Sequence, residues 1–223
     1  MAVMAPVIEA DRLFRFFHVG EEETLALRGV TLAVQPGELM AVTGPSGSGK
    51  STLLACLAGL DEPDGGTVKV AGQVMSRRPE PERAALRARA IGMVFQSANL
   101  FEHLTLDRNL ALSQSLAGRP DRDRRAALLA ELGLDRRARA FPSELSGGEA
   151  ARAGLAVALV NDPAVVLADE PTGEVDASTE ARVLTVLRER AAAGGAVIVV
   201  THSRTVSAEA DRVVGLLDGE VVD

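Results

Sequence analysis

The stretch that most constrains the fold is residues 44–52, which read Gly-Pro-Ser-Gly-Ser-Gly-Lys-Ser-Thr and match G-x-x-x-x-G-K-[ST] at every fixed position. Its three glycines allow the backbone to curl so that successive N–H groups point inward at an anion. A helix that begins near Lys50 adds the positive end of its dipole. The apolar run 39–42 precedes the loop and a helix-like segment, 51–60, follows it. This strand–loop–helix order favours a phosphate-binding loop over a surface turn of glycine and serine.

The loop also indicates how its residues divide the work. We expect Lys50 to lie against the β- and γ-phosphates of a nucleotide, and Ser51 to offer its hydroxyl to the Mg²⁺ that bridges them. The only other lysine is Lys69, so a lysine kept in the loop suits a site that needs a compact point charge. The predicted phosphate contacts comprise the whole loop: Gly44, Pro45, Ser46, Gly47, Ser48, Gly49, Lys50, Ser51 and Thr52.

The composition fits one large domain with ample core, since 47% of the 223 residues are hydrophobic. A formal net charge of −7 argues against a nucleic-acid partner, which usually needs a basic face. The single cysteine, Cys56, excludes a disulfide framework and is expected to pack in the core. The amino terminus lacks a signal-peptide pattern, and the longest uncharged run, 191–203, is too short to span a membrane. We therefore expect a soluble, cytoplasmic chain.

Periodicity divides the rest of the chain into sheet and helical regions. Residues 7–34 alternate short apolar runs with turn signals at 18–23, which predicts antiparallel strands, and 65–74 shows a similar pattern. Residues 79–89 predict a short helix before a strand at 91–95. From 96 to about 145 the pattern is helical, which predicts an insert. Its charges alternate in sign around 119–125, so a solvated face is favoured over a binding patch.

Two later apolar runs, 165–168 and 196–200, are typical of buried parallel strands. The first is followed by Asp169 and Glu170, and the second by Thr201 and His202, just as the strand at 39–42 is followed by the phosphate-binding loop. In doubly wound α/β sheets, ligands lie beyond the carboxyl ends of the strands. A structural role remains open for any single acid or histidine. Three such strand ends together favour one shared site.

These features occur in an order that resembles the ATP-binding subunit of ABC transporters over essentially the whole chain. The motifs are the loop, Gln96, the Leu-Ser-Gly-Gly-Glu of 145–149, the strand with its two carboxylates at 165–170, and His202. The segments 95–100, 145–149 and 167–173 look most like the lipoprotein-releasing and macrolide-efflux subfamily. The resemblance implies an α/β fold: a RecA-like P-loop NTPase core with an antiparallel β subdomain and a helical insert. It implies one domain, 1–223, with core and β subdomain in 1–95 and 158–223 and a helical subdomain in 96–157.

The resemblance also implies roles for individual residues. Asp169 would hold Mg²⁺ through water, and Glu170 would polarise the water that attacks ATP. Gln96 would link metal and water to the insert, and His202 would hydrogen-bond the γ-phosphate. Phe17 matches the aromatic residue that stacks on adenine, although tyrosine is commoner there and a phenylalanine in a strand often packs in a core.

A second anion-binding helix start is implied at Ser146, Gly147 and Gly148, before a helix over 149–160. In the family this signature binds the γ-phosphate of ATP held by a partner subunit, so two ATP molecules are sandwiched in a homodimer, with Asp176 crossing the interface. The sequence departs from the family pattern at four positions, which leave coupling and interface details open: Ala151, Val157, Val175 and Ser203.

The implied function is an ATPase that powers a separate integral membrane permease, for export or lipoprotein extraction, at the inner face of the cell membrane. A signalling ATPase that controls a cell-wall enzyme through a membrane partner is the alternative. A soluble ATPase of DNA repair or translation is weaker, because the chain has no second ATPase domain and no basic surface. The apolar loop 98–104, with Leu100 and Phe101, is the expected permease contact. It would otherwise pack on its own insert.

Overall fold

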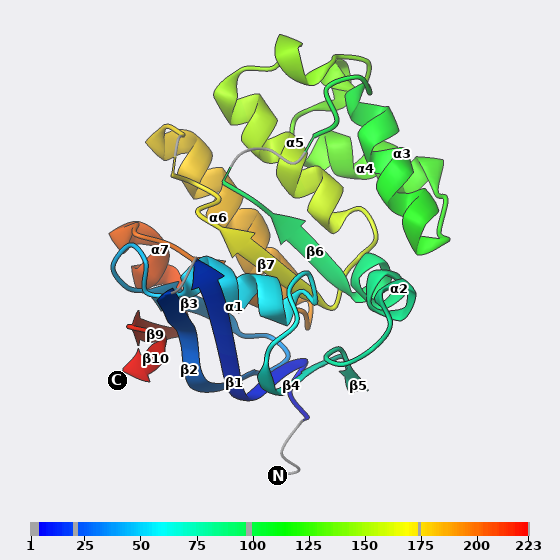
Figure 1. Ribbon diagram of the computed structural model, residues 1–223. Helices are drawn as coiled ribbons and strands as arrows, with labels where there is room; N and C mark the ends of the chain where they lie inside the picture. Colours follow the sequence, from blue (N-terminus) through cyan, green and yellow to red (C-terminus); the bar gives the residue numbers. More distant parts are fainter. Residues whose placement is uncertain (1–4, 20–21, 97–99, 174, 223) are drawn as a thin grey trace.

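Two β-sheets organise the computed structural model, which describes residues 5–19, 22–96, 100–173 and 175–222. One sheet has six strands in the order β10-β9-β3-β8-β7-β6, and the other has four in the order β2-β1-β4-β5. Figure 1 shows the four-stranded sheet at one end of the molecule and a group of helices at the opposite end. The expected combination of a parallel core, an antiparallel sheet and a helical region is confirmed.

The core of the six-stranded sheet is parallel. β3 (Leu39–Thr43), β8 (Ala196–Val200), β7 (Val165–Asp169) and β6 (Ile91–Val94) pair in parallel in that order, and β9 (Arg212–Leu217) pairs in parallel with β3. β10 (Glu220–Val222) adds an antiparallel edge strand. Every residue of β8 is buried, as expected for a strand covered on both faces.

Alternate residues of β8 face two different hydrophobic clusters. Ile198 and Val200 belong to a cluster shared with the antiparallel sheet and with α1 (Lys50–Leu57), whereas Val197 and Val199 belong to a cluster shared with α5 (Gly147–Leu159) and α6 (Ala177–Ala192). The period of two follows from strand geometry. The sheet is thus held between α1 on one face and α5 and α6 on the other.

The antiparallel sheet is built from β1 (Ile8–Val19), β2 (Glu22–Val34), β4 (Gly65–Val70) and β5 (Gln73–Val74). β1 pairs with both β2 and β4. Of the apolar side chains of β1, Ile8 and Leu13 are fully buried in the cluster that contains α1. This sheet therefore covers the helix that follows the phosphate-binding loop.

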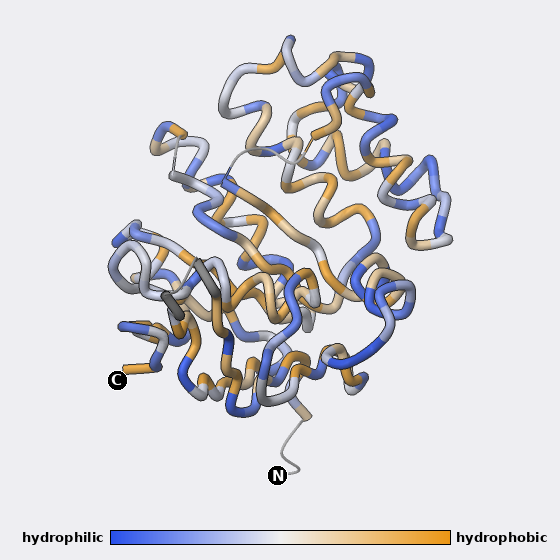
Figure 2. Tube along the Cα trace, viewed as in Figure 1, coloured by the Kyte–Doolittle hydropathy of each residue, from blue (hydrophilic) through white to orange (hydrophobic). Residues whose placement is uncertain are grey.

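The remaining helices are α2 (Glu80–Ala90), α3 (Leu106–Ala117), α4 (Arg122–Glu131) and the short α7 (Arg204–Glu209). Two 3₁₀ turns, Asp135–Arg137 and Pro142–Glu144, lie between α4 and α5. Figure 2 shows hydrophobic residues concentrated along the parallel strands and α5. Leu110 of α3 and Leu128 of α4 join the same cluster as Val166 of β7, so the helical region shares its core with the parallel sheet.

Two predicted helix boundaries are wrong. The helix predicted over 51–60 ends at Leu57, and Ala58 caps it. The helix predicted to begin at Glu149 begins at Gly147, because Ser146 accepts a hydrogen bond from the Glu149 N–H and so caps the helix two residues earlier. Among the described residues, no helix combines the length and the apolar character needed to cross a bilayer.

Candidate functional site

A cavity of about 870 Å³ lies where the strands β3, β7 and β8 end. Because neighbouring parallel strands end at one edge, their following residues meet there. Most of the predicted site residues line this cavity: Phe17, Ser46, Gly47, Gly49, Lys50, Ser51, Thr52, Gln96, Asp169, Glu170 and His202.

The loop between β3 and α1 has the backbone of an anion cradle. Gly44 and Gly49 have φ values of +150° and +101°, a region that favours glycine. A Cβ on Gly49 would lie 2.4 Å from the Ala26 carbonyl oxygen, and one on Gly44 would lie 2.1 Å from that of Leu216. Any larger residue at either position would therefore collide with the backbone of a neighbouring strand. The first residues of α1, Lys50 to Thr52, line the cavity, and the free N–H groups at a helix amino terminus suit a phosphate group.

Lys50 lies inside this curl and is only 8% exposed. Its ammonium donates to the carbonyl oxygens of Gly44 and Pro45, at 2.9 and 2.8 Å. Gly44 and Pro45 themselves line a neighbouring hollow together with Thr201 and His202, and Ser48 is buried. The predicted lysine is therefore held at the centre of the loop by the loop's own backbone.

Glu170 follows β7 in a strained conformation, with φ at +46°. Its backbone N–H donates to the Val200 carbonyl oxygen at 2.9 Å, which ties it to the end of β8. Oε2 of the Glu170 carboxylate accepts a hydrogen bond from the His202 backbone N–H at 3.3 Å, and Oε1 of the same carboxylate lies 3.6 Å from the His202 Nε2. That oxygen, Oε1, is buried without a hydrogen-bond partner. The predicted base and the predicted phosphate-sensing histidine are thus neighbours in the cavity.

The oxygen donors at the cavity also fit a magnesium ion. Ser51, Gln96 and Asp169 line it together, and hydroxyl, amide and carboxylate oxygens are ligands that Mg²⁺ accepts alongside water and phosphate. Among the described residues, no group of three His, Cys, Asp or Glu side chains is arranged to hold a metal alone. This donor set suits a cation that shares its ligands with a nucleotide.

The signature residues Ser146, Gly147 and Gly148 are not part of the cavity lining. Ser146 caps α5, and the Glu149 carboxylate in turn accepts from the Ser146 N–H at 2.9 Å. Both Ser146 and Gly147 are exposed. This helix start is therefore exposed and separate from the cavity lining.

Asp176 likewise does not line the cavity. Its carboxylate accepts from the Ser178 N–H and the Thr179 N–H, at 2.9 and 3.0 Å, and so caps α6. The hydroxyls of Ser178 and Thr179 and these N–H groups lower the pKa of Asp176 below its usual value. The residue predicted to cross an interface thus has a local capping role that the sequence analysis did not anticipate.

Several cavity residues were not predicted: Thr24, Leu25, Ala26, Arg28, Thr172, Gly173, Val200, Ser203, Asp218 and Gly219. Asp218 and Gly219 form the turn between β9 and β10, and the Gly219 N–H donates to the Ser48 carbonyl oxygen at 3.1 Å. No motif marks this turn. The parallel pairing of β9 with β3 brings it beside the loop.

Comparison with known proteins identifies the family. Residues 27–173 match the model of the family described as ABC transporter. The macrolide export ATP-binding/permease protein MacB of Hahella chejuensis is 41% identical over 220 residues, which are 97% of this chain and 34% of that protein. The protein of the same name from Escherichia coli O157:H7 is 40% identical over 98% of this chain. This chain spans about a third of the length of these relatives.

Solved structures agree with this match. The dimeric structure of the ATP-binding cassette MJ0796 in a post-hydrolysis state, bound to ADP and Pi, superimposes with a TM-score of 0.91 at 33% identity, over 97% of each chain. A second dimeric structure of MJ0796, described as a bacterial ABC transporter cassette, gives the same TM-score at 34% identity. By its family match, its relatives and its fold, the chain belongs to the ABC transporter family, as a cassette that binds and hydrolyses ATP.

Proposed function

We propose that this cassette uses ATP hydrolysis to drive an integral membrane permease for export, with macrolide-like compounds or lipoproteins as the candidate cargo, from the inner face of the cell membrane. The observation that carries the proposal is the meeting of Lys50, Glu170 and His202 in one cavity. The export name of the MacB relatives supports this role over a signalling one. Those relatives combine ATP-binding and permease functions in their name, which supports a membrane partner.

The site residues have separate tasks in this proposal. The loop 44–52 binds the phosphates, and the face of the Phe17 ring stacks on the adenine. Ser51, Gln96 and Asp169 hold Mg²⁺, which neutralises phosphate charge. Glu170 accepts a hydrogen bond from the attacking water and orients it. His202 donates to the γ-phosphate as its negative charge redistributes. The exposure of Phe17, 36%, supports stacking over a core role.

Two copies of the chain complete two sites. The helix start at Ser146 is exposed and lies outside the chain's own cavity, and its N–H groups suit a phosphate. We infer that it binds the γ-phosphate of ATP held by a second copy, with Asp176 at the interface between the two. The dimeric state of the MJ0796 structures supports this arrangement.

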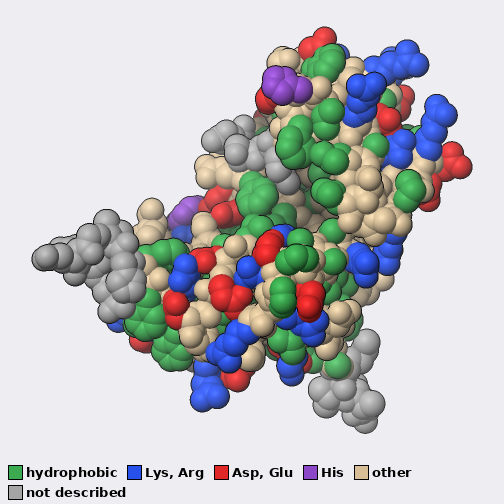
Figure 3. All heavy atoms as spheres, turned by 45° about the vertical axis from the view of Figure 1, so that its right-hand side comes forward, with side chains coloured by type: hydrophobic (Ala, Val, Ile, Leu, Met, Phe, Trp, Pro, Cys, Tyr) green, Lys and Arg blue, Asp and Glu red, His purple; other side chains and the backbone are tan. Residues whose placement is uncertain are grey.

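The permease is proposed to dock in a groove of about 700 Å³ between α2, β6, α3 and α5. Figure 3 shows hydrophobic side chains along the hollow between the helical region and the rest of the molecule. Phe101 is 62% exposed there and Leu116 is 70% exposed. Leu100 instead packs on the cluster of the helical region. Of the predicted contact stretch, Ala98 and Asn99 lie outside the described residues.

The Glu170→Gln variant tests the catalytic assignment. The amide cannot accept the proton of the attacking water, yet it leaves the phosphate and metal ligands in place. We expect turnover to fall at least about a hundredfold while ATP stays bound and the chain sediments as a dimer in MgATP. The control is Glu131→Gln, which changes an exposed carboxylate at the end of α4 that is not in the cavity lining. A Glu170→Gln chain that hydrolyses ATP at the wild-type rate would refute the assignment.

A further inference from the structure

We propose that Arg15 is a positioning residue for the nucleotide base: its guanidinium holds the Phe17 ring in the orientation that stacks on adenine. This inference rests on the proposed role of Phe17. Arg15 and Phe17 are two residues apart on β1, and the pairing of β1 with β2 is irregular between Arg15 and Phe16. The Arg15 Cζ lies over the Phe17 ring, 4.7 Å from its centroid.

The two residues have different relations to the cavity. Phe17 lines it, and Arg15 does not. Phe17 is 36% exposed, so part of its ring remains open although the Arg15 guanidinium lies over it, and the proposal assigns that open part to the base. A cation over one face of an aromatic ring is attracted by the ring quadrupole. The geometry suits a stack in which guanidinium, ring and base follow one another.

Two carboxylates fix the guanidinium. Nε of Arg15 donates to Asp61 at 2.8 Å, and Nη1 donates to Asp64 at 3.0 Å. The same oxygen of Asp64 accepts from the Phe16 N–H at 2.8 Å, which holds β1 at the irregularity between Arg15 and Phe16. The hydrogen bond to Asp61 is the main reason that the pKa of Arg15 is raised above its usual value, against the opposing effect of burial. The cation is thus fixed from two sides.

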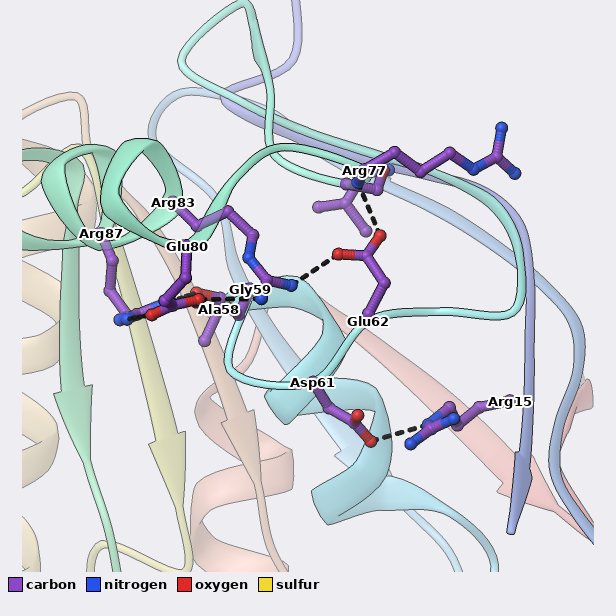
Figure 4. Close-up of polar contacts among 11 residues, drawn as sticks. Arg15, Ala58, Gly59, Asp61, Glu62, Arg77, Glu80, Arg83 and Arg87 are labelled. Carbon is purple, nitrogen blue, oxygen red and sulfur yellow. Dashed lines mark hydrogen bonds and ion pairs between the residues drawn. The ribbon is translucent and has the colours of Figure 1, made fainter.

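The chain segment that carries Asp61 and Asp64 is itself anchored, as Figure 4 shows for its residues Gly59 and Glu62. Glu62 accepts from the Arg77 N–H at 2.6 Å and from Arg83 of α2 at 2.5 Å, and Arg87 donates to the Gly59 carbonyl oxygen at 3.0 Å. This segment, 58–64, directly follows α1, whose other end begins at the phosphate-binding loop. The helix α1 therefore connects the phosphate-binding loop at its start to the segment at its end that carries the two carboxylates holding Arg15.

The consequence is preorganisation. A ring that is held before binding loses less conformational freedom when the base stacks on it. Cation–π contacts and ring fixation of this size predict an affinity loss of about three- to tenfold when the cation is removed. We expect this loss of affinity for ligands that carry a base, and no loss for ligands that consist of phosphate alone.

The test compares ADP with pyrophosphate, its base-free counterpart, by calorimetric titration of the full chain. Arg15→Met keeps an unbranched stem but removes the cation and both hydrogen bonds. We expect weaker ADP binding by about three- to tenfold and unchanged pyrophosphate binding. Arg15→Lys, which keeps a charge without the planar fork, should lie between Arg15→Met and wild type. Arg12→Met is the matched control, because Arg12 is an exposed β1 arginine that pairs with Asp11.

Phe17→Leu separates this inference from the proposed function. In that background Arg15→Met should have no further effect on ADP affinity, since the ring through which it acts is gone. If Phe17→Leu itself leaves ADP affinity unchanged, the stacking role of Phe17 is wrong. If Phe17→Leu weakens ADP binding but neither Arg15 variant does, or if Arg15→Met weakens ADP and pyrophosphate alike, the positioning role of Arg15 is wrong. Retained pyrophosphate binding shows that each variant is folded.

Discussion

At the scale of single residues, Glu149 has an unexpected position for a site that is proposed to bind phosphate. Its carboxylate lies in the first turn of α5, where it accepts from the Ser146 N–H at 2.9 Å and from Arg137 at 2.8 Å. The hydrogen bond from Ser146, followed by the one from Arg137, lowers the pKa of Glu149 from 4.5 to about 2. Arg137 offsets the negative charge, and the capping box fixes the direction of the open N–H groups.

This shift predicts a pH-dependent contribution to stability. Because the folded pKa is below the unfolded one, the contribution is complete above 4.5 and is lost as the pH falls toward about 2. We expect Glu149→Gln to lower the urea midpoint at neutral pH, and the difference from wild type to narrow as the pH falls below 4.5. Glu220→Gln, at an exposed residue of β10, is the control. A difference that stays constant with pH would contradict the assignment.

At the scale of elements, the sequence predicted what short-range patterns specify. Apolar runs followed by the phosphate-binding loop, by Asp169 and Glu170, and by His202 predicted three strand ends at one site, and the parallel pairing of β3, β8 and β7 confirms that these strands are adjacent. The start of α5 was missed because the reciprocal capping by Ser146 extends the helix over two glycines. Thr24 and Asp218 could not be predicted, because strand register rather than local sequence brings them to the cavity.

At the docking groove, too, the local sequence does not determine which side chains are exposed. Leu100 and Phe101 are adjacent and both apolar, yet only Phe101 is open to a partner. We expect Phe101→Asp and Leu116→Asp each to weaken co-purification with the permease at least about tenfold, because a buried charge replaces a large apolar contact. ATP hydrolysis by the isolated chain should persist.

Val213→Asp is the control for these variants. Val213 is an apolar residue of β9 that is 49% exposed and is not in the groove lining. It should retain the permease. Retention by both groove variants, with each of them folded, would place the docking surface elsewhere.

At the scale of the whole molecule, one chain carries half of each proposed site. Lys50 and Glu170 face the chain's own cavity, whereas Ser146 is exposed outside it. In the proposed arrangement, a monomer would bind nucleotide but would lack hydrogen-bond donors on the far side of the γ-phosphate. A mutation at Lys50 should therefore damage the site in its own chain's cavity, whereas a mutation at Ser146 should damage the site in the partner's cavity. Mixing two mutant chains in one dimer can separate these two effects.

We expect Lys50→Ala and Ser146→Arg each to abolish hydrolysis alone and to recover activity when combined. In a mixed dimer, one site carries both changes and the other carries neither. Random pairing of equal amounts makes half of the dimers mixed, so recovery to roughly a quarter of the wild-type rate is expected when sites act independently. Mass analysis of differently tagged chains verifies mixed dimers. If such dimers stay inactive and the wild-type rate also rises linearly with protein concentration, hydrolysis does not require a second chain. A quadratic rise at low concentration would instead mean that both sites must be intact before either one turns over.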